Sequence, residues 1–310
     1  MEISRDINSR IFNRLLGWEQ KQGSLPVFMQ YFRELLTIQD EVNTEAVIPE
    51  FKLTSGLLSD RIREGTPLVL LEDFQPDWAQ VQRTFKKIAI SIAEEGNSPA
   101  GEYESLKNIG DNQGLLQAVF KKWYQQNKIA GIQEAENIDS ALLISIVAAV
   151  FKPFLRAYSA QLMPLIDQEQ WQRHYCPVCG GKPDFAYLDR ERGARWLICS
   201  RCDTEWLFLR VGCPYCGTHN GDDLSYLTDE EGLLKYRLYI CKQCTNYLKA
   251  IDLRHANSDI LLPLERLTTL GIDQKAQEMG YRPGWLTYSV DSVSAKLASS
   301  DNSGRFTESM

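Results

Sequence analysis

Hydrophobic residues in the first half of the chain recur at the three- and four-residue spacing of an α-helix. This spacing predicts a series of amphipathic helices between residues 1 and 172, beginning with apolar positions Ile7, Ile11, Phe12, Leu15, Leu16, Phe28, Tyr31, Phe32, Leu35 and Leu36. Asp77 is placed to cap a further helix that stops near Gly96. Residues 138–165 are apolar almost all round, which predicts the central helix of a bundle, bent or split at Pro153.

After His174 the pattern changes to short runs rich in aromatic and β-branched residues, separated by Gly, Pro and Asp. Such runs are typical of short strands connected by turns. The predicted strands are Phe185–Leu188, Trp196–Ile198, Trp206–Leu209 and Tyr236–Ile240. From Asp252 the helical pattern returns, and Gly280 is placed as a C-terminal cap.

The region between the two helical patterns contains one cysteine unit that occurs twice. All eight cysteines form four CxxC pairs, CPVCG and CSRC in the first unit and CPYCG and CKQC in the second. Nineteen residues separate the pairs of the first unit and twenty-four those of the second, counted from Gly180 and Gly217. A CxxC turn brings two thiolates to one metal ion, and a following glycine can adopt the left-handed conformation that closes the turn. Two such turns, each at the tip of a hairpin, complete a tetrahedral shell.

This spacing favours two independent four-cysteine sites, and a cross-braced pairing of the first turn with the third stays open. The predicted metal ligands are Cys176, Cys179, Cys199 and Cys202 at one site and Cys213, Cys216, Cys241 and Cys244 at the other. A unit of under forty residues buries too little apolar surface to fold alone, whereas a structural metal contributes on the order of 10 kcal/mol. Redox-cycling thiols and disulfides fit four tandem pairs less well. Single Zn²⁺ or iron ions suit such shells, and regular pairs disfavour an iron–sulfur cluster.

The predicted fold class is therefore α+β with several domains. A helical bundle over residues 1–172 is followed by two rubredoxin-like or zinc-ribbon-like four-cysteine units, over residues 173–212 and 213–252. A helical segment over residues 253–293 comes next. Residues 294–310 are polar and lack an apolar period, which predicts a disordered tail.

Composition narrows the location and the partners. The N-terminal residues include early acids and no long apolar run, so no secretory signal is expected. The most apolar run, Ala141–Phe151, is about half of the ~20 residues that a membrane span requires. We therefore expect a cytoplasmic protein without membrane insertion, in a compartment where paired cysteines more often bind metal than form disulfides. Residues 176–252 carry ten basic and eleven acidic side chains, opposite to the balance of a nucleic-acid-binding module.

Other polar residues near the cysteines have weaker claims to a role. Three histidines lie near the cysteines: His174 two residues before Cys176, His219 three residues after Cys216, and His255 beyond the second unit. Because each shell is already filled by four sulfurs, we expect them at the surface or behind the ligands. Another cluster surrounds the second turn of the first unit: Arg195, Arg201, Trp206 and Arg210. It either tunes a thiolate through an N–H donor or forms an ordinary solvated hairpin around a buried ring. No nucleotide-binding glycine motif occurs, and no catalytic residue is predicted.

The chain resembles the formate dehydrogenase accessory protein family, FdhE, in four segments: HYCPVCGGKP, RWLICSRCDTEWLFLRVGCPYCG, LYICKQCTNYLKAID and LLPLERLTTLGIDQKAQEMGY. The resemblance implies a cytoplasmic protein that binds the catalytic subunit of a respiratory formate dehydrogenase before export through the twin-arginine pathway. It also implies two rubredoxin-like folds with iron as the metal. The eight cysteines match the family's ligand positions one by one.

We therefore expect a non-enzymatic accessory protein that binds two mononuclear metal ions. The resemblance favours iron, and zinc is the other candidate. One alternative is a rubredoxin-like electron carrier that acts in cofactor maturation. A second alternative is a zinc-ribbon protein that binds nucleic acid, which the acidic balance of the cysteine region disfavours.

Overall fold

The computed structural model describes residues 2–45, 53–96, 100–126, 129, 131, 132, 135, 137–229, 235–286 and 306–309. The chain forms two compact units, each of which is described by itself. The helical unit comprises Met1–Leu58 and Leu68–Leu165, and the sheet unit comprises Ser59–Pro67 and Ile166–Met310. The observed architecture confirms the α+β fold class, with helices first and a cysteine-bearing sheet after them.

The helical unit contains α1 (Glu2–Gln22), α2 (Val27–Glu45), the start of α3 (Ser55–Glu64), α4 (Trp78–Gly96), α5 (Ala100–Asp111), α6 (Gln113–Gln126) and α7 (Ser140–Leu162). Asp77 caps α4 as predicted, because its Oδ1 accepts a hydrogen bond from the Ala79 N–H at 2.9 Å. Aromatic rings fill the core, with the centroids of Phe120 and Phe151 4.1 Å apart.

Helix α7 is the most buried helix of this unit. Asp139 caps it by accepting a hydrogen bond from the Leu142 N–H. The helix continues through Pro153, so of the two predicted effects of this proline, a bend or a split, the split does not occur. Together with the 3-10 turn η2 (Met163–Leu165), it forms a stretch long and apolar enough to cross a membrane by length and composition. Half of the most apolar window is buried inside the structure. A core helix passes the same test, and the buried face of α7 is consistent with that position.

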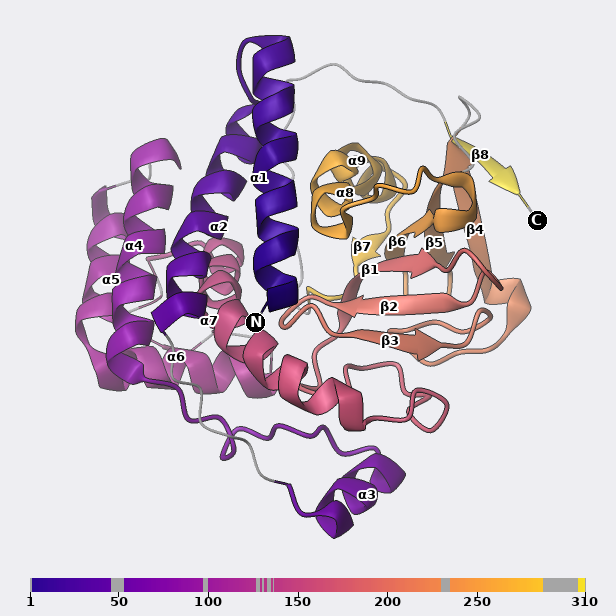
Figure 1. Cartoon of the computed structure of the whole chain (residues 1–310), viewed down its shortest axis with the longest axis horizontal. Coiled ribbons are helices and arrows are strands. Elements are labelled where there is room, and N and C mark those ends of the chain that lie inside the picture. Colours follow the sequence, from indigo (N-terminus) through magenta and orange to yellow (C-terminus); the bar gives the residue numbers. More distant parts are fainter. Residues whose placement is uncertain are drawn as a thin grey trace. The chain divides into compact units, whose positions relative to one another are not determined.

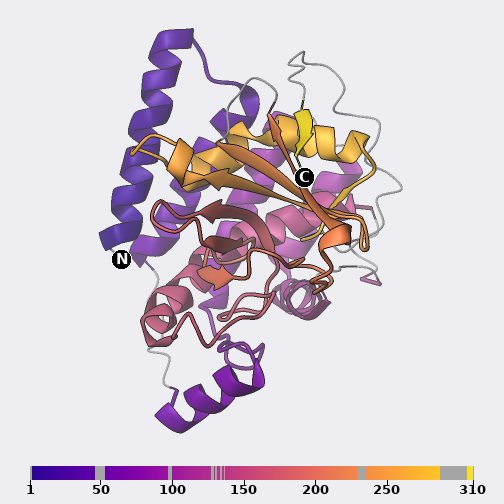
Figure 2. The same cartoon turned by 90° about the vertical axis from the view of Figure 1, so that its right-hand side faces the viewer.

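The sheet unit is built on one sheet that contains both cysteine units (Figures 1 and 2). Its strands are β1 (Pro183–Leu188), β2 (Arg195–Cys199), β3 (Glu205–Phe208), β4 (Leu224–Asp229), β5 (Tyr236–Cys241), β6 (Asn246–Asp252), β7 (Arg282–Pro283) and β8 (Phe306–Ser309). The order is β3-β2-β1-β6-β5-β4-β8, with β7 beside β6. Strands of the same cysteine unit pair antiparallel, whereas β1 and β6 pair in parallel, from Phe185 opposite Lys249 to Leu188 opposite Asp252. This parallel pair of strands joins the two cysteine units into one sheet.

The C-terminal helices α8 (Leu262–Thr268) and α9 (Leu270–Glu278) belong to the core of the sheet unit. Leu262 packs against a cluster of Phe185, Ile198 and Ile251. Ile272 and Ala276 of α9 pack with residues from β4, β5 and β6. The predicted cap at Gly280 is present, with φ +85°.

Several elements differ from the sequence prediction. Strands β4 and β6 were not predicted, and β6 shows no alternation because six of its seven residues are buried. Strand β8 pairs with β4 inside the segment predicted to be a disordered tail. Residues 294–305 and 310 of that segment, and residues 287–293 of the predicted C-terminal helical segment, lie outside the described residues.

Candidate metal centres

The backbone makes the same closed turn at the start of each cysteine unit. In the first, the Cys176 N–H donates to the Gly181 carbonyl at 2.8 Å, and the Gly180 N–H donates back to the Cys176 carbonyl at 3.0 Å. In the second, the equivalent hydrogen bonds from Cys213 and Gly217 are 2.9 and 3.0 Å. Each turn therefore holds its two thiols on one side of the backbone.

The residue after the second cysteine is left-handed in all four turns. Gly180 and Gly217 have φ of +69° and +75°, which confirms the predicted role of these glycines. Asp203 and Thr245 occupy the same position in the other two turns, each with φ +54°. Residues other than glycine rarely adopt this backbone conformation, and a β-branched residue such as Thr245 is strained in it. The turn geometry is therefore retained even where the sequence lacks glycine.

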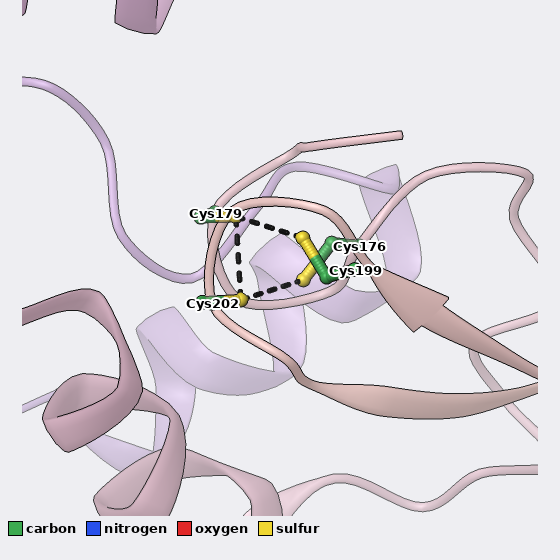
Figure 3. A group of neighbouring side chains, drawn as sticks. All are labelled: Cys176, Cys179, Cys199 and Cys202. Carbon is green, nitrogen blue, oxygen red and sulfur yellow. Dashed lines mark hydrogen bonds between the residues drawn. The ribbon is translucent and has the colours of Figure 1, made fainter. Parts of the chain in front are cut away.

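The four turns form two groups rather than a cross-braced arrangement. Cys176, Cys179, Cys199 and Cys202 form the first site, and Cys213, Cys216, Cys241 and Cys244 form the second site. The second turn of each group connects antiparallel strands, β2 with β3 and β5 with β6, as predicted. The first turn of each group precedes β1 or follows β3, so it is not the tip of a hairpin in this sheet. Figure 3 shows the four thiols of the first site directed toward one another.

The sulfur positions fit a single tetrahedral ion at each site. In the first site, Cys176–Cys202, Cys179–Cys199 and Cys179–Cys202 are each 3.5 Å apart between Sγ atoms. In the second site the corresponding short distances are 3.6 and 3.7 Å. A tetrahedron with metal–sulfur bonds of about 2.3 Å has edges of about 3.8 Å, whereas a disulfide requires about 2 Å. The eight cysteines are thus arranged as two candidate four-sulfur shells with free thiols.

Burial disfavours the thiolate form of several of these cysteines in the absence of a cation. Burial raises the pKa of the Cys176 and Cys202 thiols well above their ordinary value. Burial likewise raises the pKa of Cys241 to about 11. A bound cation reverses this effect because it stabilises the thiolate form. Backbone amides contribute at both sites, where the N–H groups of Arg201 and Tyr215 donate to Cys199 Sγ and Cys213 Sγ, each at 3.4 Å.

An arginine from a distant helix anchors the first site. Arg266 of α8 donates to Asp203 Oδ1 at 2.5 Å, to Asp184 Oδ1 at 2.8 Å and to the Cys199 carbonyl at 3.2 Å. These bonds fix the second turn of the site against β1. Sequence analysis missed Arg266 because no local pattern connects residue 266 with the cysteines.

A glycine next to the first site was also missed. A Cβ atom at Gly181 would lie 2.8 Å from Cys199 Sγ and 3.0 Å from Arg201 Cδ. The two halves of the first site therefore meet only because residue 181 has no side chain. The doubled glycine of CPVCGG, which has no counterpart in CPYCGT, was the available signal.

Arg195 of the predicted arginine cluster contacts the segment between β3 and Cys213, the first cysteine of the second site. It is 2% exposed, and its Nη2 donates to the carbonyls of Leu209 and Gly212, the latter at 2.6 Å. Its guanidinium lies over the rings of Phe208 and Tyr239 at 5.2 and 5.3 Å. Burial lowers the pKa of this guanidinium to about 10, so it stays charged at neutral pH. The arginine thus holds the segment that leads into Cys213.

The remaining predicted candidates do not supply ligands. Trp206 is a buried ring whose Nε1 donates to the Arg173 carbonyl at 3.0 Å, and Arg210 is exposed. Within the described residues, the metal-binding groups contain only cysteines. His174, His219 and His255 therefore lie outside both shells, as predicted.

The fold and the two candidate sites define a class of α+β protein that carries paired tetracysteine centres on one sheet. Residues 175–210, which include the whole first site, match the family model described as FdhE, central domain. The chain is 26% identical to the FdhE homolog of Aquifex aeolicus (strain VF5) over 275 residues, covering 87% of this chain and 90% of that protein. It is 32% identical to protein FdhE of Escherichia coli (strain K12) over 166 residues, about half of each chain (49% and 53%).

A solved structure has the same fold. The crystal structure of the FdhE protein from Pseudomonas aeruginosa superimposes with a TM-score of 0.61 and 22% identity, covering 91% of this chain and 95% of that one. The matched family model and these relatives show that the chain is similar to FdhE proteins, and the crystal structure shows that it shares their fold.

Proposed function

We propose that this protein is a cytoplasmic accessory protein that binds the catalytic subunit of a respiratory formate dehydrogenase and is needed for its activity. The observation that carries the proposal is the similarity to FdhE proteins, which extends over most of the chain in the Aquifex homolog. In this proposal the two four-sulfur shells each hold one ion, iron or zinc, and the protein itself catalyses no reaction.

The role of the ions in this proposal is structural support of the partner-binding unit. Four thiolates and one ion close each shell, and the parallel pairing of β1 with β6 makes the two shells part of one sheet. In this proposal a surface built on this sheet depends on both ions, because each ion joins two cysteine turns that are separate in the sequence. The proposal therefore connects metal occupancy to partner binding.

Two experiments in the host cell test the proposal. First, deletion of the gene is expected to abolish formate dehydrogenase activity while its catalytic subunit is still synthesised, and a plasmid copy is expected to restore it. Second, the affinity-tagged full chain, purified without oxygen, is expected to retain that subunit, as identified by mass spectrometry. An untagged extract on the same resin is the control. Full enzyme activity in the deletion strain, or a tagged chain without any molybdenum or tungsten oxidoreductase subunit, contradicts the proposal.

The exposure of Cys216 favours a second candidate function, that of an electron carrier. A sulfur ligand at the surface shortens the path for an electron between a bound iron and a partner. Ferric iron in a shell of four thiolates absorbs visible light, whereas d¹⁰ zinc does not. A coloured protein that is bleached by reductant supports this candidate, and a colourless protein filled with zinc excludes it.

A further inference from the structure

The two four-cysteine sites have the same turn geometry, but different residues pack against their first turns. At the first site the ring of Pro67 lies over the turn, since a Cβ atom at Gly180 would be 3.0 Å from Pro67 Cγ. This segment, residues 65–67, is held in place by Tyr175, whose hydroxyl donates to the Gly65 carbonyl at 2.6 Å. We call residues 65–67 the cover segment. At the second site, a Cβ atom on the equivalent Gly217 would meet nothing within 4 Å.

The exposure of the sulfur ligands follows this difference. All four cysteines of the first site are buried, and Cys179 is the most exposed of them at 3%. In the second site Cys213 and Cys241 are buried, but Cys244 is half-buried and Cys216 is exposed. Cys216 and Cys179 occupy the same position in their turns, the second cysteine of CPxCG. The two cysteines are therefore equivalent ligands that differ in their exposure to solvent.

The opening at Cys216 is local rather than the result of a loosely attached unit. On the other side of the same turn, Arg195 donates to the Gly212 carbonyl next to Cys213. The Tyr215 hydroxyl also donates to the Pro183 carbonyl of β1 at 3.0 Å. The first cysteine of the turn is thus fixed to the sheet, and the second faces solvent.

We propose that the second site is the exchange site of this protein, that is, the site where an external soft donor such as a thiol replaces Cys216 as a ligand of the ion. The first site keeps all four of its ligands and its ion. The proposal rests on the proposed occupancy of both sites by metal. Cys216 is the residue that gives way because exposure controls the access of an external ligand to a cysteine. In the exchange Cys216 accepts the proton that the incoming thiol releases, so that charge balances without an oxidant or a reductant.

The test uses the full chain reconstituted with two equivalents of Zn²⁺ under reducing conditions. The loaded chain is treated with N-ethylmaleimide while a chromophoric chelator reports the zinc that is released. Mass spectrometry of peptides locates the modified cysteines at each time. We expect Cys216 to be alkylated first, together with the release of one zinc, and the second zinc to leave roughly tenfold more slowly or slower still.

A variant at the cover segment separates burial from intrinsic differences between the shells. Pro67→Gly removes the ring over the first turn and leaves every cysteine in place. This variant is expected to accelerate both the slow release of zinc from the first site and the alkylation of Cys179. The fast release of zinc from the second site should not change. If both ions leave wild-type protein together, or Cys179 reacts before Cys216, the exchange-site proposal is wrong. A chain that binds fewer than two ions instead overturns the two-site occupancy on which the proposal rests.

Discussion

At the scale of single residues, the two turns that lack glycine after their second cysteine place a strained residue there, Asp203 in one and Thr245 in the other. Thr245 adopts φ +54° after the second turn of the second site, whereas the same position after the first turn is occupied by Gly217. We expect Thr245→Gly to stabilise the metal-loaded protein by roughly 0.5–1 kcal/mol, because relief of the strained conformation exceeds the entropic cost of glycine. Urea unfolding followed by tryptophan fluorescence measures this change.

The same substitution at residue 203 serves as the matched comparison. Asp203 has the same φ, but its carboxylate accepts a hydrogen bond from Arg266. Asp203→Gly is therefore expected to destabilise the protein, since it relieves strain but breaks the anchor of the first site. Equal effects of the two substitutions would contradict the stabilising role of the contact between Asp203 and Arg266.

Gly181 is a second position where one atom matters. An added Cβ would lie 2.8 Å from Cys199 Sγ, so Gly181→Ala is expected to separate the two turns of the first site and weaken its ion binding. Competition with a zinc chelator measures the loss, which we expect to be tenfold or more for about 1.4 kcal/mol of strain. Gly221→Ala is the control because nothing lies within 4 Å of its Cβ position. Unchanged zinc affinity of Gly181→Ala would contradict the close approach.

At the scale of elements, α8 stabilises the first site through Arg266. Removing this side chain leaves Asp184 and Asp203 without their shared cation. Arg266→Ala is expected to cost about 2 kcal/mol in the free energy of unfolding, less than the loss of one partner from a fully buried ion pair, because these side chains are 15–23% exposed. Lys275→Ala is the control, since its 4.0 Å pair with Glu278 is on the surface and should contribute less than about 1 kcal/mol. Urea unfolding of both variants checks the comparison, and similar losses would contradict the anchor.

Sequence alone predicted the local elements better than their pairing. The cysteine turns, the cap at Asp77 and strands β1, β2, β3 and β5 follow from short-range patterns. The pairing of β1 with β6 does not, because the two strands are far apart in the sequence and β6 lacks the alternation of a strand with one exposed face. Arg266 was missed for the same reason. Contacts between distant segments are set by packing, which local patterns do not encode.

At the scale of the whole molecule, the two compact units should respond differently to loss of metal. The helical unit has its own aromatic core around Phe120 and Phe151, whereas the sheet unit contains both four-sulfur shells. Chelation under reducing conditions is therefore expected to unfold the sheet unit and leave most of the helical signal intact. Circular dichroism combined with limited proteolysis measures both effects. Simultaneous loss of both units, or a sheet unit that resists protease without metal, would contradict this prediction.

The central claim is that the eight cysteines form two four-sulfur shells, each around one ion. Metal analysis of the full chain, purified from its host without oxygen, tests this claim most directly when combined with titration of its thiols. We predict two ions per chain, iron or zinc, and eight reduced thiols after the metal is removed. A well-folded protein that contains neither metal, or whose cysteines are joined in disulfides, would contradict the account.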